Sequence, residues 1–185
     1  MKNFQYITLI FFLLFAQNSF GQHHEHQTNA SNKASQNLGT VEESLKATLN
    51  NVLNMYYQLK DALVADNSPL AKQKAGDFLK TLAKVEMNKM TAPQHTFWMK
   101  YFEKLRSDAE HINETQDIKH QRDHFSDLSA NLWEVLKSFR VNEKPAYQQY
   151  CPMEKAYWVS AEKAVKNPYY GKKMLTCGKV NATLE

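Results

Sequence analysis

Four successive stretches of apolar residues at helical spacing constrain this chain more than any other feature. In each stretch, apolar side chains recur every three or four residues, which places them on one face of an α-helix. The stretches begin near Val41, Ser68, Thr91 and Gln116. Because short links join the stretches, residues 40–140 are predicted to form a four-helix up-down bundle, and the fold class is predicted to be all-α.

Residues at the helix ends and inside the helices support this interpretation. Thr40 followed by Glu43 matches a capping box, and Pro69 is predicted to occupy the first position of the second helix. Gly76 lies inside that helix, where glycine costs about 1 kcal/mol relative to alanine. We therefore expect Gly76 to mark a close helix crossing.

The residues before the helical pattern have the features of a secretory leader. Lys2 supplies a positive charge, residues 7–15 form a short apolar run, and Ser19, Phe20 and Gly21 precede a predicted cleavage point. An uncleaved anchor is the alternative, but about nine apolar residues fall short of the roughly twenty in a membrane-spanning helix. Residues 1–21 are therefore predicted to be a cleaved signal peptide, which makes the mature chain periplasmic or secreted, without stable membrane insertion.

Residues 22–39 are predicted to be a disordered tether, because they contain too little apolar surface to offset the entropy of ordering. His23, His24 and His26 offer imidazoles that suit Cu(II), Zn(II) or Ni(II). They form a candidate accessory capture site. The alternative is a solvated segment that binds metal without specificity.

Composition and motifs exclude several classes of function. The formal net charge is +4 over 185 residues, and basic residues are spread along the chain, so no clustered footprint for nucleic acid exists. The sequence contains no glycine-rich phosphate loop, no serine nucleophile elbow and no His-Glu-x-x-His helix. We expect one domain that is not an enzyme and does not bind nucleic acid.

Residues 141–185 form a tail that holds both cysteines and is rich in turn residues rather than helical periodicity. Asn167-Pro168 and Tyr170-Gly171 favour turns, so loops and short hairpin or helical pieces are predicted. The tail is too short for a core of its own and is expected to complete the helical domain. Its aromatic residues are expected to pack on the bundle: Tyr157, Trp158, Tyr169 and Tyr170.

Each cysteine of the tail has a methionine close to it in sequence: Met153 follows Cys151, and Met174 precedes Cys177. Thiolate and thioether sulfur are the ligands that soft copper(I) prefers, so these four residues are candidate copper(I) ligands if the connector folds back. The alternative is a disulfide between Cys151 and Cys177, which would close a loop of about 27 residues and contribute roughly 3.5 kcal/mol. The residues alone leave both interpretations open.

The fourth helix offers a second candidate metal site. His120 and His124 have the i, i+4 spacing of a helical clamp, with Asp117 and Asp127 on the same side. A further ligand would come from the third helix, from His95 or His111. Zinc is the ion considered for this set. The alternative, which the sequence favours, is a solvated polar face beside the apolar stripe.

Motifs of the tail resemble a known family. Tyr150-Cys151-Pro152-Met153, Trp158-Val159-Ser160 and the run from Asn167 to Gly178 resemble a bacterial domain family of unknown function. That family occurs as small exported proteins and fused to periplasmic adaptor subunits of heavy-metal efflux pumps. The resemblance covers about residues 40 to 180 and implies a helical bundle with a C-terminal Cys/Met element linked to copper handling. The Cys and Met candidates match the family pattern, but many members have histidine where this chain has Tyr150.

From these features we expect a periplasmic protein that binds copper(I) and sequesters it or passes it on in connection with metal efflux. The partners expected are the metal ion and a periplasmic efflux adaptor. The alternative function is a disulfide-stapled helical module that docks on an efflux adaptor or another envelope protein.

Overall fold

The computed structural model describes residues 38–185 of the chain. The predicted leader and the tether histidines His23, His24 and His26 lie outside the described residues. Within residues 38–185, no helix combines the length and the apolar character that crossing a membrane requires.

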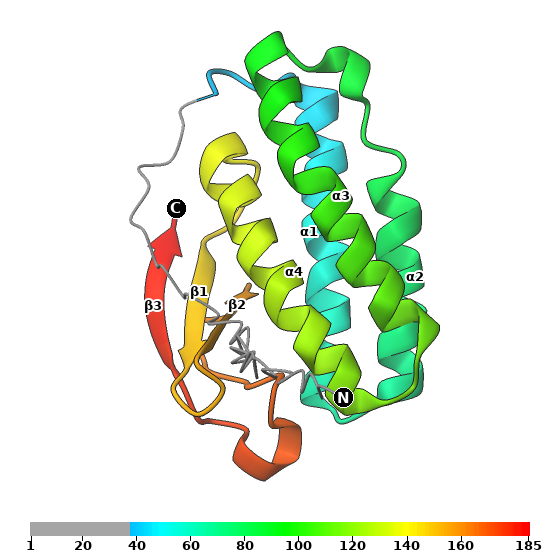
Figure 1. Cartoon of the computed structure of the whole chain (residues 1–185). Coiled ribbons are helices and arrows are strands. Elements are labelled where there is room, and N and C mark those ends of the chain that lie inside the picture. The colour runs from blue at the N-terminus through cyan, green and yellow to red at the C-terminus, as the bar shows by residue number, and fades with distance from the viewer. Residues whose placement is uncertain (1–37) are drawn as a thin grey trace, which may run out of the picture. The chain divides into compact units, whose positions relative to one another are not determined.

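Four long helices lie side by side and form the larger part of the fold (Figure 1). They are α1 (Glu43–Val64), α2 (Ser68–Leu82), α3 (Ala92–Glu114) and α4 (Ile118–Phe139), with a short 3-10 helix η1 (Met87–Lys89) between α2 and α3. Each long helix packs against the next one along the chain. This helical core is compatible with the predicted four-helix bundle.

Side-chain caps set where the helices begin. Helix α3 starts as predicted, because Thr91 and Gln94 form a reciprocal capping box. Helix α1 starts after Glu42, whose carboxylate accepts a hydrogen bond from the backbone N–H of Leu45 at 3.2 Å. The cap is therefore two residues later than the predicted Thr40.

The all-α prediction is wrong, because the tail forms a three-stranded antiparallel sheet and the fold is mixed α and β. The strands are β1 (Ala146–Cys151), β2 (Ala156–Ser160) and β3 (Lys179–Leu184), in the order β2-β1-β3. The sheet lies beside α4 (Figure 1). The sequence pattern does not reveal strand β1, because Gln148 and Gln149 interrupt its apolar residues. A bulge between these two residues also breaks the two-residue alternation.

A buried tyrosine on α1 joins the sheet to the helices. The Tyr56 hydroxyl lies 2.7 Å from the Ser129 hydroxyl on α4 and accepts a hydrogen bond from the Val159 N–H on β2 at 3.0 Å. Its ring stacks on Phe125 with a centroid distance of 5.2 Å. Burial raises the pKa of Tyr56, so the hydroxyl stays neutral. One hydroxyl therefore holds three elements together, and the tail shares the core of the bundle.

The connector between β2 and β3 is held by an ionic network. Arg122 on α4 donates to the Pro168 carbonyl at 2.8 Å and to the Asp66 carboxylate at 2.6 Å. Asp66 also accepts from the backbone N–H of Lys172 at 2.9 Å, in the 3-10 helix η2 (Gly171–Met174). Gly171 has φ +54° and a Cβ there would clash with Asp66, so only glycine suits this contact.

Candidate metal sites

The register of the sheet brings the two cysteines together. Strands β1 and β3 pair with Tyr150 opposite Lys179. Cys151 follows Tyr150, and Cys177 lies just before the start of β3, so both reach the same end of the sheet. The Asn167 side chain bridges the Cys151 sulfur and the Cys177 carbonyl, and both cysteines are free. Two thiols that are far apart in sequence are thus neighbours.

A glycine makes the close approach of the second cysteine possible. Gly178 follows Cys177 with φ +144°, a conformation that favours glycine. A Cβ at this position would lie 2.8 Å from the Tyr150 carbonyl oxygen and 2.8 Å from the Trp158 ring. Any larger residue would push the Cys177 backbone away from β1.

Asn167 fixes both cysteines from the connector. Its side chain is fully buried, and its amide Nδ2 donates to the Cys151 sulfur at 3.1 Å and to the Cys177 carbonyl at 2.7 Å. Its Oδ1 accepts from the backbone N–H groups of Tyr169 at 2.8 Å and Tyr170 at 3.2 Å. The asparagine therefore sets the shape of the loop and the position of the thiols at the same time.

The two thiols differ in exposure. Cys151 is fully buried and accepts a second hydrogen bond, from the Glu154 N–H at 3.4 Å, whereas Cys177 is partly exposed. Desolvation is the main cause that raises the pKa of the Cys177 thiol above its ordinary value, and the nearby Cys151 raises it further. Cys177 is therefore protonated at neutral pH, and a metal ion that binds there displaces the proton.

The two methionines of the predicted sulfur set lie at the surface of the same tail. Met153, in the turn after β1, is 59% exposed, and Met174, at the end of η2, is 37% exposed. Met174 is linked to the site through its backbone, because its carbonyl accepts from the Cys177 N–H at 3.0 Å. The structure groups the two thiols, and the ligand role of the methionines stays a prediction.

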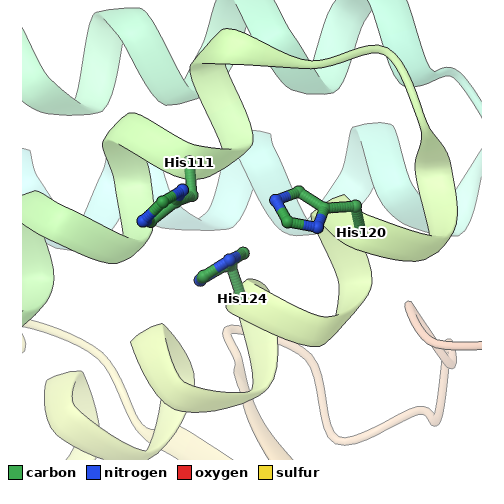
Figure 2. Close-up of side chains that lie close together, drawn as sticks. All are labelled: His111, His120 and His124. Atoms are coloured by element: carbon green, nitrogen blue, oxygen red, sulfur yellow. The ribbon is translucent and has the colours of Figure 1, made fainter.

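A second cluster lies where α3 turns into α4. His111 is in the last turn of α3, and His120 and His124 are in the first two turns of α4 (Figure 2). One potential ligand atom from each ring lies within 4.8 Å of the others. The His111 and His124 rings stack with a centroid distance of 4.2 Å, and those of His120 and His124 are 4.7 Å apart. The sequence offered His95 or His111 as the third member, and the structure brings in His111.

The other residues considered for this cluster have different positions. His95 is in the first turn of α3, about 24 Å along the helix from His111 at 1.5 Å per residue. Asp117 caps α4 by accepting from the Lys119 N–H at 2.9 Å. Asp108, which sequence reasoning missed, lies 3.3 Å from His124 Nδ1. Its place three residues before His111 on the same helix face was a usable signal.

Comparison with known proteins places the helical part in a family. A family model described as a protein of unknown function (DUF3347) matches residues 52–144, which is 93 of the 185 residues. The matched stretch runs from within α1 to just before β1, so it includes the histidine cluster and ends before Cys151. Neither the curated proteins nor the solved structures contain a match to the chain.

Proposed function

Since the chain belongs to the DUF3347 family, whose function is unknown, we propose a function from the geometry of its tail. The protein binds copper(I) between the thiolates of Cys151 and Cys177. The observation that carries this proposal is that the β1–β3 register and the Asn167 bridge bring two free cysteines together at the buried end of β1.

The chemistry of the pair suits a soft monovalent ion. Copper(I) prefers thiolate sulfur, whereas a structural zinc ion requires four ligands in a tetrahedron. On binding, copper(I) forms one bond to each sulfur, each thiol releases its proton, and no oxidant or reductant is needed. Because Cys151 is fully buried, hydrated ions such as Mg²⁺ are disfavoured at the site.

The exposed methionines suit a role in loading and release. Thioether sulfur is also a soft ligand. Met153 is in the turn just after Cys151, Met174 is at the end of η2 just before Cys177, and both side chains reach solvent. In the proposal they capture copper(I) at the surface and pass it to the thiols, of which Cys177 is the accessible one.

The proposal includes export to the periplasm and a link to metal efflux. The leader-like residues 1–21 and the resemblance of the tail to proteins fused with efflux adaptors support it. The protein would sequester copper(I) or hand it to an adaptor. The tether histidines, His23, His24 and His26, would serve as an accessory capture site.

A competition experiment tests the copper site. Reduced protein is titrated with copper(I) against a chromophoric chelator, beside a Cys151→Ser/Cys177→Ser variant. Removal of an outer-shell partner of a metal ligand lowers affinity about 10–100-fold. The double variant lacks both proposed ligands, so we expect it to lose more affinity than this. Equal affinities for the two proteins would refute the proposal.

Methionine variants refine the same experiment. Met153→Leu and Met174→Leu should slow the transfer of copper(I) from the chelator, because they remove soft donors at the surface. Met99→Leu is the matched control, since Met99 is 39% exposed on α3. An equal slowing by the control variant would remove the methionines from the proposal.

The disulfide-stapled interaction module is the second candidate, because the same proximity of the two cysteines favours bond formation in an oxidising compartment. Alkylation followed by mass measurement, on protein taken from its own compartment without reductant, separates the two functions. Two modified cysteines support the copper site. Protein without free thiols supports the module.

A further inference from the structure

Three histidine side chains from two helices converge beside the α3–α4 turn (Figure 2). We infer that His111, His120 and His124 form a second metal site. It binds a divalent ion of intermediate softness, such as Zn²⁺ or Cu²⁺. Three neutral imidazoles are the ligand set that these ions accept. The inference is independent of the copper(I) proposal, because the two sites share no residue.

The backbone geometry explains why the three rings meet. Helices α3 and α4 are antiparallel neighbours joined by residues 115–117, so positions close to the turn on each helix lie side by side. His111 is three residues before the end of α3, and His120 is two residues after the start of α4. His124 follows one turn later, on the same face as His120.

A buried glutamine holds this turn in place. The Gln121 side chain is fully buried, and its Nε2 donates to the carbonyls of Ser68 at 3.1 Å, Thr115 at 2.9 Å and Ile112 at 3.4 Å. Gln121 directly follows His120, so the hydrogen bonds fix the backbone that carries the cluster. The backbone that carries the histidines is therefore positioned before any ion binds, which lowers the ordering cost of binding.

The distances between the rings require only side-chain rotation for binding. Around a tetrahedral ion with metal–nitrogen bonds of about 2.0–2.1 Å, ligand nitrogens lie about 3.3 Å apart. In the structure, the ligand atoms of the three histidines lie within 4.8 Å of one another, which is a wider spacing than bound ligands require. His111 and His120 are exposed and can turn, whereas His124 is partly buried. The fourth coordination position faces solvent, since the cluster is at the surface.

An aspartate supports the least mobile of the three ligands. Asp108 lies 3.3 Å from His124 Nδ1 and approaches from α3. This contact leaves Nε2 of His124 as the atom that binds the ion. A carboxylate that accepts from the second nitrogen of a metal-binding histidine orients the ring and raises its basicity. Asp108 is therefore a positioning residue of the site.

The test uses the full chain with its other metal-binding groups removed. The background carries Cys151→Ser, Cys177→Ser and alanine at the three tether histidines, and it is titrated with Zn²⁺ by calorimetry. We expect one Zn²⁺ per chain. Adding His120→Gln should lower the affinity more than tenfold, and Asp108→Asn should lower it about 10–100-fold. His95→Gln is the matched control, because His95 is an exposed histidine on α3 outside the cluster.

A second measurement does not depend on the multiple variant. In the reduced wild-type chain, the ring signals of His111, His120 and His124 in ¹H–¹⁵N spectra should shift together on addition of Zn²⁺, while those of His95 stay in place. Loss of Zn²⁺ affinity in the control variant equal to that in His120→Gln, or ring signals that do not move, would overturn the inference. Copper(I) binding should survive His120→Gln, so the two sites can fail separately.

Discussion

Replacement of Asn167 by alanine should destabilise the tail and loosen the thiol pair. The side chain is fully buried and joins the Cys177 carbonyl and the Tyr169 N–H through separate atoms. Alanine leaves both main-chain groups without these partners, and each buried polar group left unpaired costs about 1–3 kcal/mol. We expect a loss of about 3 kcal/mol in the free energy of unfolding, which corresponds to a melting temperature about 6–12 °C lower for a domain of this size.

Thermal unfolding followed by circular dichroism measures this effect, with Asn181→Ala as the control. Asn181 is an exposed asparagine of β3 with one side-chain hydrogen bond, to Gln148 at 2.9 Å, so its replacement should change stability by about 0.5 kcal/mol or less. A separate variant, Asn167→Asp, keeps the acceptor but puts negative charge beside the thiolates, and should weaken copper(I) binding. Equal stabilities of Asn167→Ala and Asn181→Ala would refute the role given to Asn167.

Three further predictions follow from the same contacts. Tyr56→Phe leaves the Val159 N–H unpaired and should cost about 2 kcal/mol in chemical denaturation, whereas Tyr57→Phe, whose hydroxyl has no hydrogen-bond partner among residues 38–185, should cost less. Burial acts to raise the pKa of Asp66, but the Lys172 N–H and Arg122 outweigh it, so the pKa is lowered. The ionised Asp66 carboxylate therefore stabilises the fold fully above the ordinary pKa of aspartate, and this stabilisation is lost as the pH falls through the lowered pKa. Asp66→Asn should flatten this part of an acid-unfolding curve. The raised pKa of Cys177 predicts that copper(I) affinity increases with pH, about tenfold per unit for each proton displaced, in competition titrations at several pH values. The first prediction is contradicted if Tyr56→Phe leaves the stability unchanged, and the second if Asp66→Asn leaves the acid-unfolding curve unchanged. The third is contradicted if copper(I) affinity does not change with pH.

The helices were predictable because their signals are local. The apolar stripes depend on residues three or four apart, and the start of α3 at Thr91 was also visible in the sequence. Gly76 was expected at a close crossing, and a Cβ there would lie 2.8 Å from Asn113 Oδ1 on α3. These features need no knowledge of the rest of the chain.

The sheet was not predictable because its stability is not local. Gln149 occupies a fully buried position in β1, where its Nε2 donates to the carbonyls of Glu162 and Lys163 at 3.0 and 3.1 Å. A polar residue at a buried position interrupts the apolar pattern by which a strand is recognised in a sequence. The pairing of β1 with β3 also joins residues that are 29 to 38 positions apart in the sequence.

The candidate sites were predictable in part. The sequence indicated the chemistry of Cys151 and Cys177 and the i, i+4 relation of His120 and His124. Their completion by Asn167, Asp108 and His111 depends on the chain folding back. Asn167 was interpreted only as a turn residue, because its buried amide has a role only once both cysteines are beside it.

X-ray absorption at the copper edge tests the central proposal most directly. Reduced protein loaded with one equivalent of copper(I) should show a first shell of sulfur, and that shell should be lost in the Cys151→Ser/Cys177→Ser variant. A first shell of nitrogen or oxygen in the wild-type protein, or a sulfur shell unchanged in the variant, would contradict the assignment of copper(I) to the two thiols.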